Sequence, residues 1–286
     1  MADLMIIGKN GQLGKELVSA ANKLGFSVIA FGKEELDVRK YNQVKKEIER
    51  IKPKVVINTS TYQVVDECEK NPKIAFDVNT LGVRNIADIC RNNKILTITY
   101  STDYVFDGKK GEQYVEADRP NPLQIYGISK LAGELACLDY NFNSIIIRTC
   151  ALFGGKYGSK KKGNFVINTI REVEGKKFYE VNCDQIINPT YANDLAEATL
   201  KLISKNATPG IYHLVNEGYC SWADFAQTIM KLKNINTEII PIERKGIYGK
   251  IKRPLFTALS NTKAKKLGVT LPSWQSGLER YIKLYT

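Results

Sequence analysis

The chain opens with an apolar run and a glycine-rich turn, Leu4-Met5-Ile6-Ile7-Gly8-Lys9-Asn10-Gly11-Gln12-Leu13-Gly14. The run 4–7 is long enough for a buried strand, and Leu13, Leu17 and Leu24 recur at helical spacing. Gly25 ends that pattern, and the apolar segment 26–30 predicts a second strand. Strand, turn, helix and strand form a βαβ unit, whose strands are parallel and whose crossover is right-handed.

The glycines of this turn have the spacing G-x-x-G-x-x-G. Gly8 permits the tight turn, Gly11 lets the backbone approach a diphosphate, and Gly14 lets helix and strand pack closely. The N-terminus of the following helix offers free N–H groups and the positive end of its dipole to phosphates. The turn therefore predicts a dinucleotide site with these candidate residues: Gly8, Asn10, Gly11, Gln12, Leu13 and Gly14.

Helical and strand patterns continue to alternate beyond this unit. Helices are expected around 44–51 and 72–89, and strands at 54–58, 95–100 and 144–148. This alternation predicts an α/β fold with a Rossmann-type, doubly wound parallel sheet. We expect a dinucleotide-binding domain over 1–149, which 181–204 rejoins, and a smaller, irregular substrate lobe over 150–180 and 205–286.

The composition narrows the function classes. The chain has 286 residues, with 42 Lys+Arg and 30 Asp+Glu, a net charge of +12. The lysines are spread along the whole chain, so the charge fits either an anionic small-molecule substrate or a lysine-rich surface better than nucleic acid. No apolar run approaches the roughly 18–20 residues of a membrane span. Six scattered cysteines and one histidine argue against a metal site or a disulfide framework, and for reduced thiols in the cytoplasm.

Polar residues that suit catalysis follow the strand predicted at 95–100. Ser101 and Thr102 come at its carboxyl end, where open α/β sheets bind ligands. Tyr126 and Lys130 stand four residues apart in a predicted helix and therefore share a face. An ammonium group close to a phenol lowers the pKa of the phenol, so that Tyr126 could exchange a proton near neutral pH. A Thr102 or Ser101 hydroxyl could hydrogen-bond the same substrate oxygen.

These motifs together resemble the extended short-chain dehydrogenase/reductases and, within them, the dTDP-4-dehydrorhamnose reductase family. The resemblance covers essentially the whole chain, and its further motifs are Leu36-Asp37-Val38, Ser101-Thr102-Asp103-Tyr104-Val105-Phe106-Asp107-Gly108, Asn164-Phe165, Asp184-Gln185, Pro189-Thr190, Tyr212-His213-Leu214, Ser221-Trp222, Arg253-Pro254 and Trp274-Gln275. The family implies NAD(P)H-dependent reduction of the 4-keto group of dTDP-6-deoxy-L-lyxo-4-hexulose to dTDP-L-rhamnose, in cell-surface polysaccharide biosynthesis.

The resemblance also implies roles for individual residues. Tyr126 would protonate the developing alkoxide, and Lys130 would bind the nicotinamide ribose and lower the pKa of Tyr126. Thr102 would complete the catalytic set. Asp37 and Val38 would lie beside the adenine, and Ser60 would also contact the cofactor. Candidate residues for the dTDP-sugar are Ser101, Asp103, Val105, Phe106, Asn164 and Arg253.

Several features leave alternatives open. Ala151 stands where the family normally has tryptophan, and Ile187 where it has glycine, which leaves room for a different nucleotide sugar. A non-catalytic regulatory protein of the same fold is a further alternative.

The end of the second strand bears on the choice of cofactor. It ends Phe31-Gly32-Lys33, without an acidic residue to hold the ribose of NAD. Lys33, with Lys9, could instead meet a 2′-phosphate, which favours NADPH over NADH. The lysines 160–162 could close over a diphosphate. The sequence leaves open whether the chain forms a homodimer and whether a metal ion stabilises one.

Overall fold

A six-stranded parallel sheet forms the centre of the computed structural model, which describes residues 2–155 and 163–285. The lysines 160–162 therefore lie outside the described residues. The strand order is β10-β5-β4-β3-β1-β2, and every pairing is parallel, as the βαβ pattern predicts. The bounds are β1 Leu4–Ile7, β2 Val28–Phe31, β3 Val55–Asn58, β4 Leu96–Thr102, β5 Ser144–Thr149 and β10 Gly210–His213.

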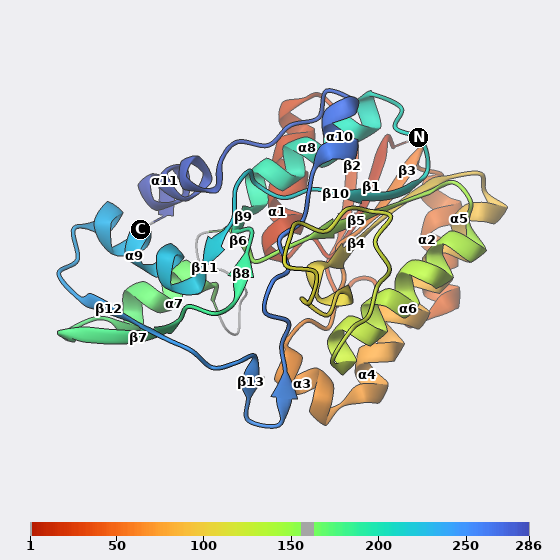
Figure 1. Cartoon of the computed structure of the whole chain (residues 1–286). Coiled ribbons are helices and arrows are strands. Elements are labelled where there is room, and N and C mark those ends of the chain that lie inside the picture. The colour runs from red at the N-terminus through yellow and green to blue at the C-terminus, as the bar shows by residue number, and fades with distance from the viewer. Residues whose placement is uncertain (1, 156–162, 286) are drawn as a thin grey trace.

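Helices cover both faces of this sheet (Figure 1). Leu4 and Ile6 of β1 face one helical layer, whereas Met5 and Ile7 face the other, because successive strand residues point to opposite sides. Burial on both sides explains why the strands read as continuous apolar runs. The first layer holds α1 Gln12–Lys23 and α8 Ala192–Ser204; the second holds α2 Tyr41–Ile51, α5 Gly82–Asn92 and α6 Ile125–Tyr140.

The long helix expected from Pro72 is interrupted. It divides into α4 Pro72–Phe76, the π-helical turn η1 Asp77–Leu81 and α5, after the short α3 Val65–Lys70. Asn79 in the π-helical turn is fully buried and bonds to α6 and to the segment after β3. These tertiary bonds, which no local apolar pattern encodes, accompany the change in helical geometry.

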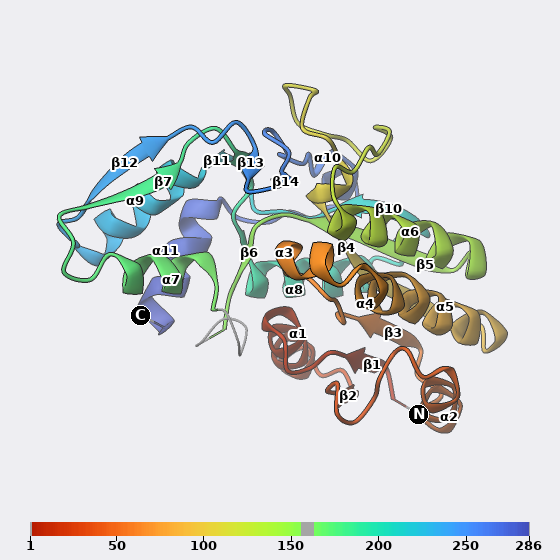
Figure 2. The same ribbon diagram turned by 90° about the horizontal axis from the view of Figure 1, so that it is seen from below.

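The second lobe lies to one side of the sheet (Figure 2), and its core is a cluster of aromatic rings. Phe153 lies at the centre of this cluster and contacts Tyr191, Phe225 and Tyr281 with ring centroids 5.5–5.6 Å away. Its elements are β6 Leu152–Phe153, α7 Phe165–Glu172, β7 Phe178–Asn182, β8 Ile186–Ile187, β9 Thr190–Tyr191, β11 Cys220–Ser221, α9 Trp222–Lys233, β12 Glu238–Ile242, β13 Ile247–Tyr248, β14 Ile251–Lys252 and α11 Trp274–Tyr285. The short helix α10 Thr262–Lys266 packs instead against β10 of the central sheet.

One boundary between the two predicted lobes differs from expectation. Strand β10, within the segment 205–286 assigned to the substrate lobe, pairs with β5 and forms the edge of the central sheet. This parallel pairing joins segments more than 60 residues apart in sequence, so no local pattern predicts it. Helix α8, which lies in the segment predicted to rejoin the first domain, packs against α1. The rest of the division stays a prediction.

The six cysteines are all unpaired thiols. Over the described ranges, no helix combines the length and apolar character needed to cross a membrane.

Candidate active site

The glycine turn at the end of β1 has the geometry of a phosphate cradle. Gly8 has a φ of 95°, a conformation that favours glycine. A Cβ atom on Gly14 would lie 2.2 Å from the Gly8 carbonyl oxygen, so only glycine lets α1 approach the turn this closely. None of the side chains that the structure describes caps the N-terminus of α1, so its first N–H groups are available to a ligand. The turn therefore fits the diphosphate of a dinucleotide.

Replacing Gly14 by alanine is expected to disrupt both folding and dinucleotide binding. The added Cβ meets backbone atoms at 2.2–2.9 Å, and overpacking of this kind typically costs about 1–3 kcal/mol of stability. Gly11→Ala is the matched control, since its Cβ would have Gly8 oxygen as nearest neighbour at 3.4 Å. That variant should keep its unfolding temperature and lose only cofactor affinity. Equal unfolding temperatures for both variants would contradict this view of the turn.

An acidic side chain that the sequence prediction missed lies at the end of β2. Glu35 accepts hydrogen bonds from the Gly32 N–H at 2.6 Å and from Lys9 Nζ at 2.8 Å. A turn follows Gly32, in which the Glu35 N–H donates to the Gly32 carbonyl oxygen, so the Glu35 carboxylate lies next to Gly32. The expectation that no acidic residue stands here is therefore wrong. Lys33 is exposed, whereas Lys9 is already neutralised by Glu35.

The other cofactor candidates border the same end of the sheet. Asp37 is held by Arg39 in an ion pair of 2.6 Å, which lowers the pKa of its carboxyl group. Val38 is buried against Gly82. The Ser60 N–H donates to the Asn58 side chain, beside the Gly8 turn.

The N-terminus of α6 lies close against the carboxyl end of β4. A Cβ on Gly127 would lie 2.2 Å from the Tyr104 carbonyl oxygen, so this glycine permits the close approach. The Gln124 side chain caps α6 by accepting the Gly127 N–H at 2.6 Å, and Glu69 of α3 accepts the Ile125 N–H at 2.7 Å. These contacts fix the first turn of the helix, and with it Tyr126.

The structure brings Thr102 and Tyr126 together. The Thr102 hydroxyl interacts with the Tyr126 phenol and favours its ionised form, as does the Thr61 hydroxyl. Burial has the larger, opposite effect and raises the pKa of Tyr126 well above its usual value, with a further contribution from the nearby Asp103 carboxylate. The expected lowering of this pKa by Lys130 is therefore not seen in the free protein: burial dominates, and the groups that favour the ionised phenol are the Thr102 and Thr61 hydroxyls.

Lys130 lies one helical turn further along α6, in the protein interior. Its side chain is only 5% exposed, and its Nζ donates to the Tyr100 carbonyl oxygen at 2.5 Å. Burial lowers the pKa of the ammonium group to about 8. At neutral pH the group is still mainly charged, which suits a role beside an anionic or polar ligand.

Two of the predicted sugar-binding residues lie at the end of β4. Asp103 accepts a hydrogen bond from the Thr102 hydroxyl at 2.9 Å, and burial raises the pKa of its carboxyl group. Ser101 is buried next to it, and its hydroxyl has no hydrogen-bond partner among the described residues. Arg253 reaches from the second lobe towards Asp66 of α3, 3.7 Å away, and so lies between the two lobes.

Three of the predicted sugar contacts instead have structural surroundings. Val105 and Phe106 are completely buried, and the Phe106 ring stacks on Tyr114 with centroids 4.1 Å apart. Asn164 caps α7 and donates to Tyr281 at 2.9 Å and to the Gly154 carbonyl oxygen at 3.2 Å. In the structure these three side chains therefore have packing and capping roles, and their contact with a sugar stays a prediction.

Comparison with known proteins decides the family. The model of the family described as RmlD substrate binding domain matches residues 1–286. The chain belongs to this family. The resemblance deduced from the glycine turn and the Tyr-x-x-x-Lys motif is thereby confirmed.

Several proteins and solved structures are similar to this chain along its whole length. The chain is 34% identical to the spore coat polysaccharide biosynthesis protein SpsK of Bacillus subtilis, over 99% of this chain and 98% of that protein. It is also 34% identical to dTDP-4-dehydrorhamnose reductase of Aggregatibacter actinomycetemcomitans, over 98% of both. The solved dTDP-4-dehydrorhamnose reductase of Bacillus anthracis in complex with NADP has a TM-score of 0.92, 34% identity and full coverage of both chains.

Asn79 is a residue of this RmlD-family site that sequence reasoning missed. Its side chain accepts from Thr61 at 3.1 Å and donates to the Ser129 hydroxyl at 3.0 Å, so it links the segment after β3 to α6, the helix that carries Tyr126 and Lys130. A buried asparagine inside an otherwise apolar helical pattern carries no local signal of this role.

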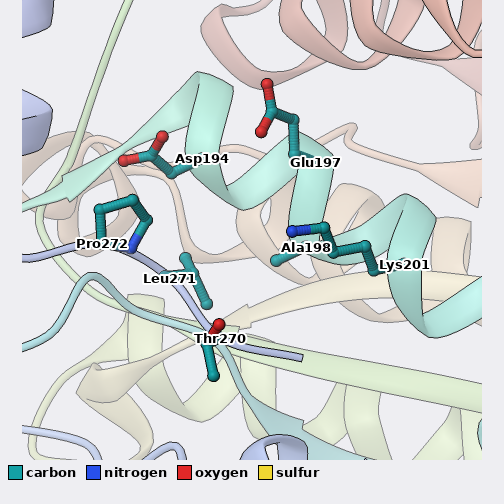
Figure 3. Close-up of a pocket in the computed structure, with 7 residues that line it drawn as sticks. All are labelled: Asp194, Glu197, Ala198, Lys201, Thr270, Leu271 and Pro272. Carbon is teal, nitrogen blue, oxygen red and sulfur yellow. The ribbon is translucent and has the colours of Figure 1, made fainter. Parts of the chain in front are cut away.

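One cavity of this RmlD-family chain lies away from the catalytic residues. It has about 280 Å³ and is bounded by α8 and residues 270–272 (Figure 3). Asp194 lines it but is already paired with Arg280 at 2.7 Å, and Glu197, Lys201 and Thr270 are exposed. The residues that the structure describes include no group of three His, Cys, Asp or Glu side chains placed to hold a metal ion.

Proposed function

We propose that the chain uses NADPH to reduce the 4-keto group of a dTDP-4-keto-6-deoxy sugar, dTDP-6-deoxy-L-lyxo-4-hexulose, to dTDP-L-rhamnose. The observation that carries this proposal is the meeting of Thr102 and Tyr126 at the end of β4, one helical turn from buried Lys130. Relatives of this family named dTDP-4-dehydrorhamnose reductase support the substrate class. The reaction would serve nucleotide-sugar and cell-surface polysaccharide biosynthesis in the cytoplasm, where unpaired thiols persist.

The geometry supplies the groups that a carbonyl reduction needs. Reduced nicotinamide dinucleotide supplies the hydride when bound. Tyr126 donates a proton to the oxygen that becomes the alcohol, and its raised pKa keeps the phenol protonated for this direction of the reaction. Thr102 hydrogen-bonds the same oxygen and orients it. Lys130 holds the nicotinamide ribose, and its positive charge stabilises the phenolate that Tyr126 leaves behind.

A coupled assay tests this function. The keto sugar is formed in situ, and loss of reduced nicotinamide is followed with NADPH and with NADH. We expect turnover with NADPH, whereas absence of oxidation with either cofactor would refute the proposal. Omission of the sugar is the control, because it measures oxidation that is unrelated to the substrate.

Preference for NADPH rests on exposed Lys33 and on the relative that was solved with NADP. Glu35→Gln tests the electrostatics of this corner. Removing the negative charge should raise the affinity for NADPH relative to NADH by about 2- to 5-fold, the size of an exposed charge interaction. Fluorescence titration with both cofactors measures the ratio. Glu34→Gln, an equally exposed neighbour, should leave it unchanged, and the same ratio in both variants would contradict the assignment.

A different nucleotide sugar is the second candidate, favoured by Ala151. This alanine has a φ of 42° in the left-handed region, and its small side chain packs in a cluster that includes Trp222. Without a large ring at this position, the sugar side of the site differs from the pattern expected of the family. A panel of nucleotide 4-keto sugars separates the candidates through their kcat/KM values. Preference for another base or deoxysugar would favour the second.

A further inference from the structure

A buried ion pair lies directly behind the catalytic lysine. Glu134 stands one helical turn after Lys130 on α6, and Arg148 projects from β5 on the same side of the sheet. Arg148 Nη2 and Glu134 Oε2 are 2.6 Å apart, and each side chain is only 2% exposed. A second bond joins Arg148 Nε to Glu134 Oε1 at 3.0 Å, so the pair is bidentate.

Burial of such a pair costs free energy of folding, because both charged groups lose their hydration. Replacing a buried pair by apolar residues is often neutral or stabilising, so stability alone does not account for it. The Arg148 guanidinium also stacks over the buried Phe106 ring at 5.1 Å, which fixes its orientation. A fixed arginine in turn fixes the carboxylate of Glu134.

Lys130 lacks a direct ion-pair partner in the part of the chain that the structure describes. Its Nζ donates to a carbonyl oxygen, and burial acts against its charged form. Among the neighbouring groups, the negative charge of Glu134 does most to favour the charged form of Lys130. Cys137 acts in the same direction, but burial raises the pKa of its thiol to about 11, so it is neutral when the enzyme works.

The charged groups on the neighbouring elements are engaged elsewhere. Asp103 at the end of β4 acts on Tyr126, and Arg84 of α5 lies over the Tyr140 ring. Asp77 of η1 pairs with Lys73 of α4, and Glu69 of α3 caps α6. His213 of β10 is neutral, because burial lowers its pKa to about 3.

We propose that Glu134 is a positioning residue for the reduction: fixed by Arg148, it holds the buried ammonium group of Lys130 charged and in place. This inference rests on the proposed function, in which protonated Lys130 binds the nicotinamide ribose. Because Glu134 favours the charged form of Lys130, its removal must make Lys130 lose its proton at lower pH. The reduction needs Lys130 protonated, so the alkaline limb of its pH profile reports this change.

Glu134→Gln tests the inference with little change in shape. We expect the alkaline limb of kcat/KM to move about one pH unit lower, the size of effect that one nearby charge has in a protein interior. The variant also leaves Arg148 unpaired and can be too unstable to assay. The double variant Glu134→Gln with Arg148→Met removes both charges, and the limb should move in the same direction.

Asp194→Asn is the matched control, since it breaks another carboxylate–arginine pair with a buried acid, Asp194–Arg280, away from the catalytic residues. It should lower the unfolding temperature without moving the limb. If the Glu134 variants fold and their alkaline limb of kcat/KM lies at the same pH as in the parent enzyme, the inference is overturned. Should the parent enzyme turn over no keto sugar, the proposed function fails. The role of Glu134 is then tested by NADPH titration without turnover. Glu134→Gln must weaken NADPH binding more at about pH 9 than at about pH 6.5. Equal weakening at both pH values overturns the inference.

Discussion

Tyr126→Phe is expected to lower kcat by about 10²–10⁴-fold, the range found for removal of a positioned acid or base. The substitution removes only the phenolic oxygen, which contacts the Thr102 hydroxyl and would protonate the substrate oxygen. Affinity for NADPH should stay within a few-fold of the parent value, because the cofactor turn and Lys130 are untouched. Steady-state kinetics and fluorescence titration measure the two quantities separately.

Tyr104→Phe is the matched control for this variant. Tyr104 lies beside Tyr126, with ring centroids 6.2 Å apart, so the same atom is removed from a neighbouring ring. Only Tyr126→Phe should abolish most of the turnover. An enzyme that keeps its activity without the Tyr126 hydroxyl would exclude this residue as the proton donor. Cofactor binding without turnover in the parent enzyme would instead favour a non-catalytic regulatory protein.

Lys130→Met should lower kcat/KM by at least about 100-fold. A charge-assisted hydrogen bond contributes about 1.5–3 kcal/mol, and in the proposed mechanism the same ammonium group would also stabilise the phenolate of Tyr126. The loss should appear in KM for NADPH as well as in kcat, unlike that of Tyr126→Phe. Lys130→Arg keeps the charge but not the shape, and it should recover only part of the activity.

The same variant should be at least as stable as the parent enzyme at neutral pH. Burial lowers the pKa of Lys130 to about 8, so the charged side chain destabilises the folded state below that pH. Between about pH 8 and pH 10.5 the folded protein releases this proton while the unfolded chain keeps it, so the stability of the parent rises. The advantage of Lys130→Met in unfolding temperature should therefore shrink over that range. A variant less stable than the parent at neutral pH would contradict the assignment of a costly buried charge.

Local patterns were sufficient to predict the core of the fold. The glycine spacing, the buried strands and the helical pair Tyr126 and Lys130 each depend on neighbours within one element or one βαβ unit. The sheet, the turn and the N-terminus of α6 are therefore as expected. The family follows from the same motifs because they extend along the whole chain.

Features that depend on distant contacts could not be predicted. The edge strand β10 and the π-helical turn around Asn79 join segments far apart in sequence, and the Glu134–Arg148 pair joins a helix to the strand that follows it. The position of Glu35 could not be predicted, because its carboxylate contacts Gly32 only through the turn that follows β2. Motif matches also cannot separate a ligand contact from packing, so the stacking of Phe106 on Tyr114 and the bond from Asn164 to Tyr281 could not be predicted.

Transfer of deuterium tests the central claim most directly. The enzyme is incubated with the dTDP-4-keto-6-deoxy sugar and NADPH that carries deuterium at the transferable position of the nicotinamide. We predict a 6-deoxy sugar nucleotide with one deuterium on its C4 carbon, and at least about 100-fold slower formation of this product when Tyr126→Phe replaces the parent enzyme at equal concentration. A keto sugar recovered unlabelled and unreduced by the parent enzyme would contradict the account.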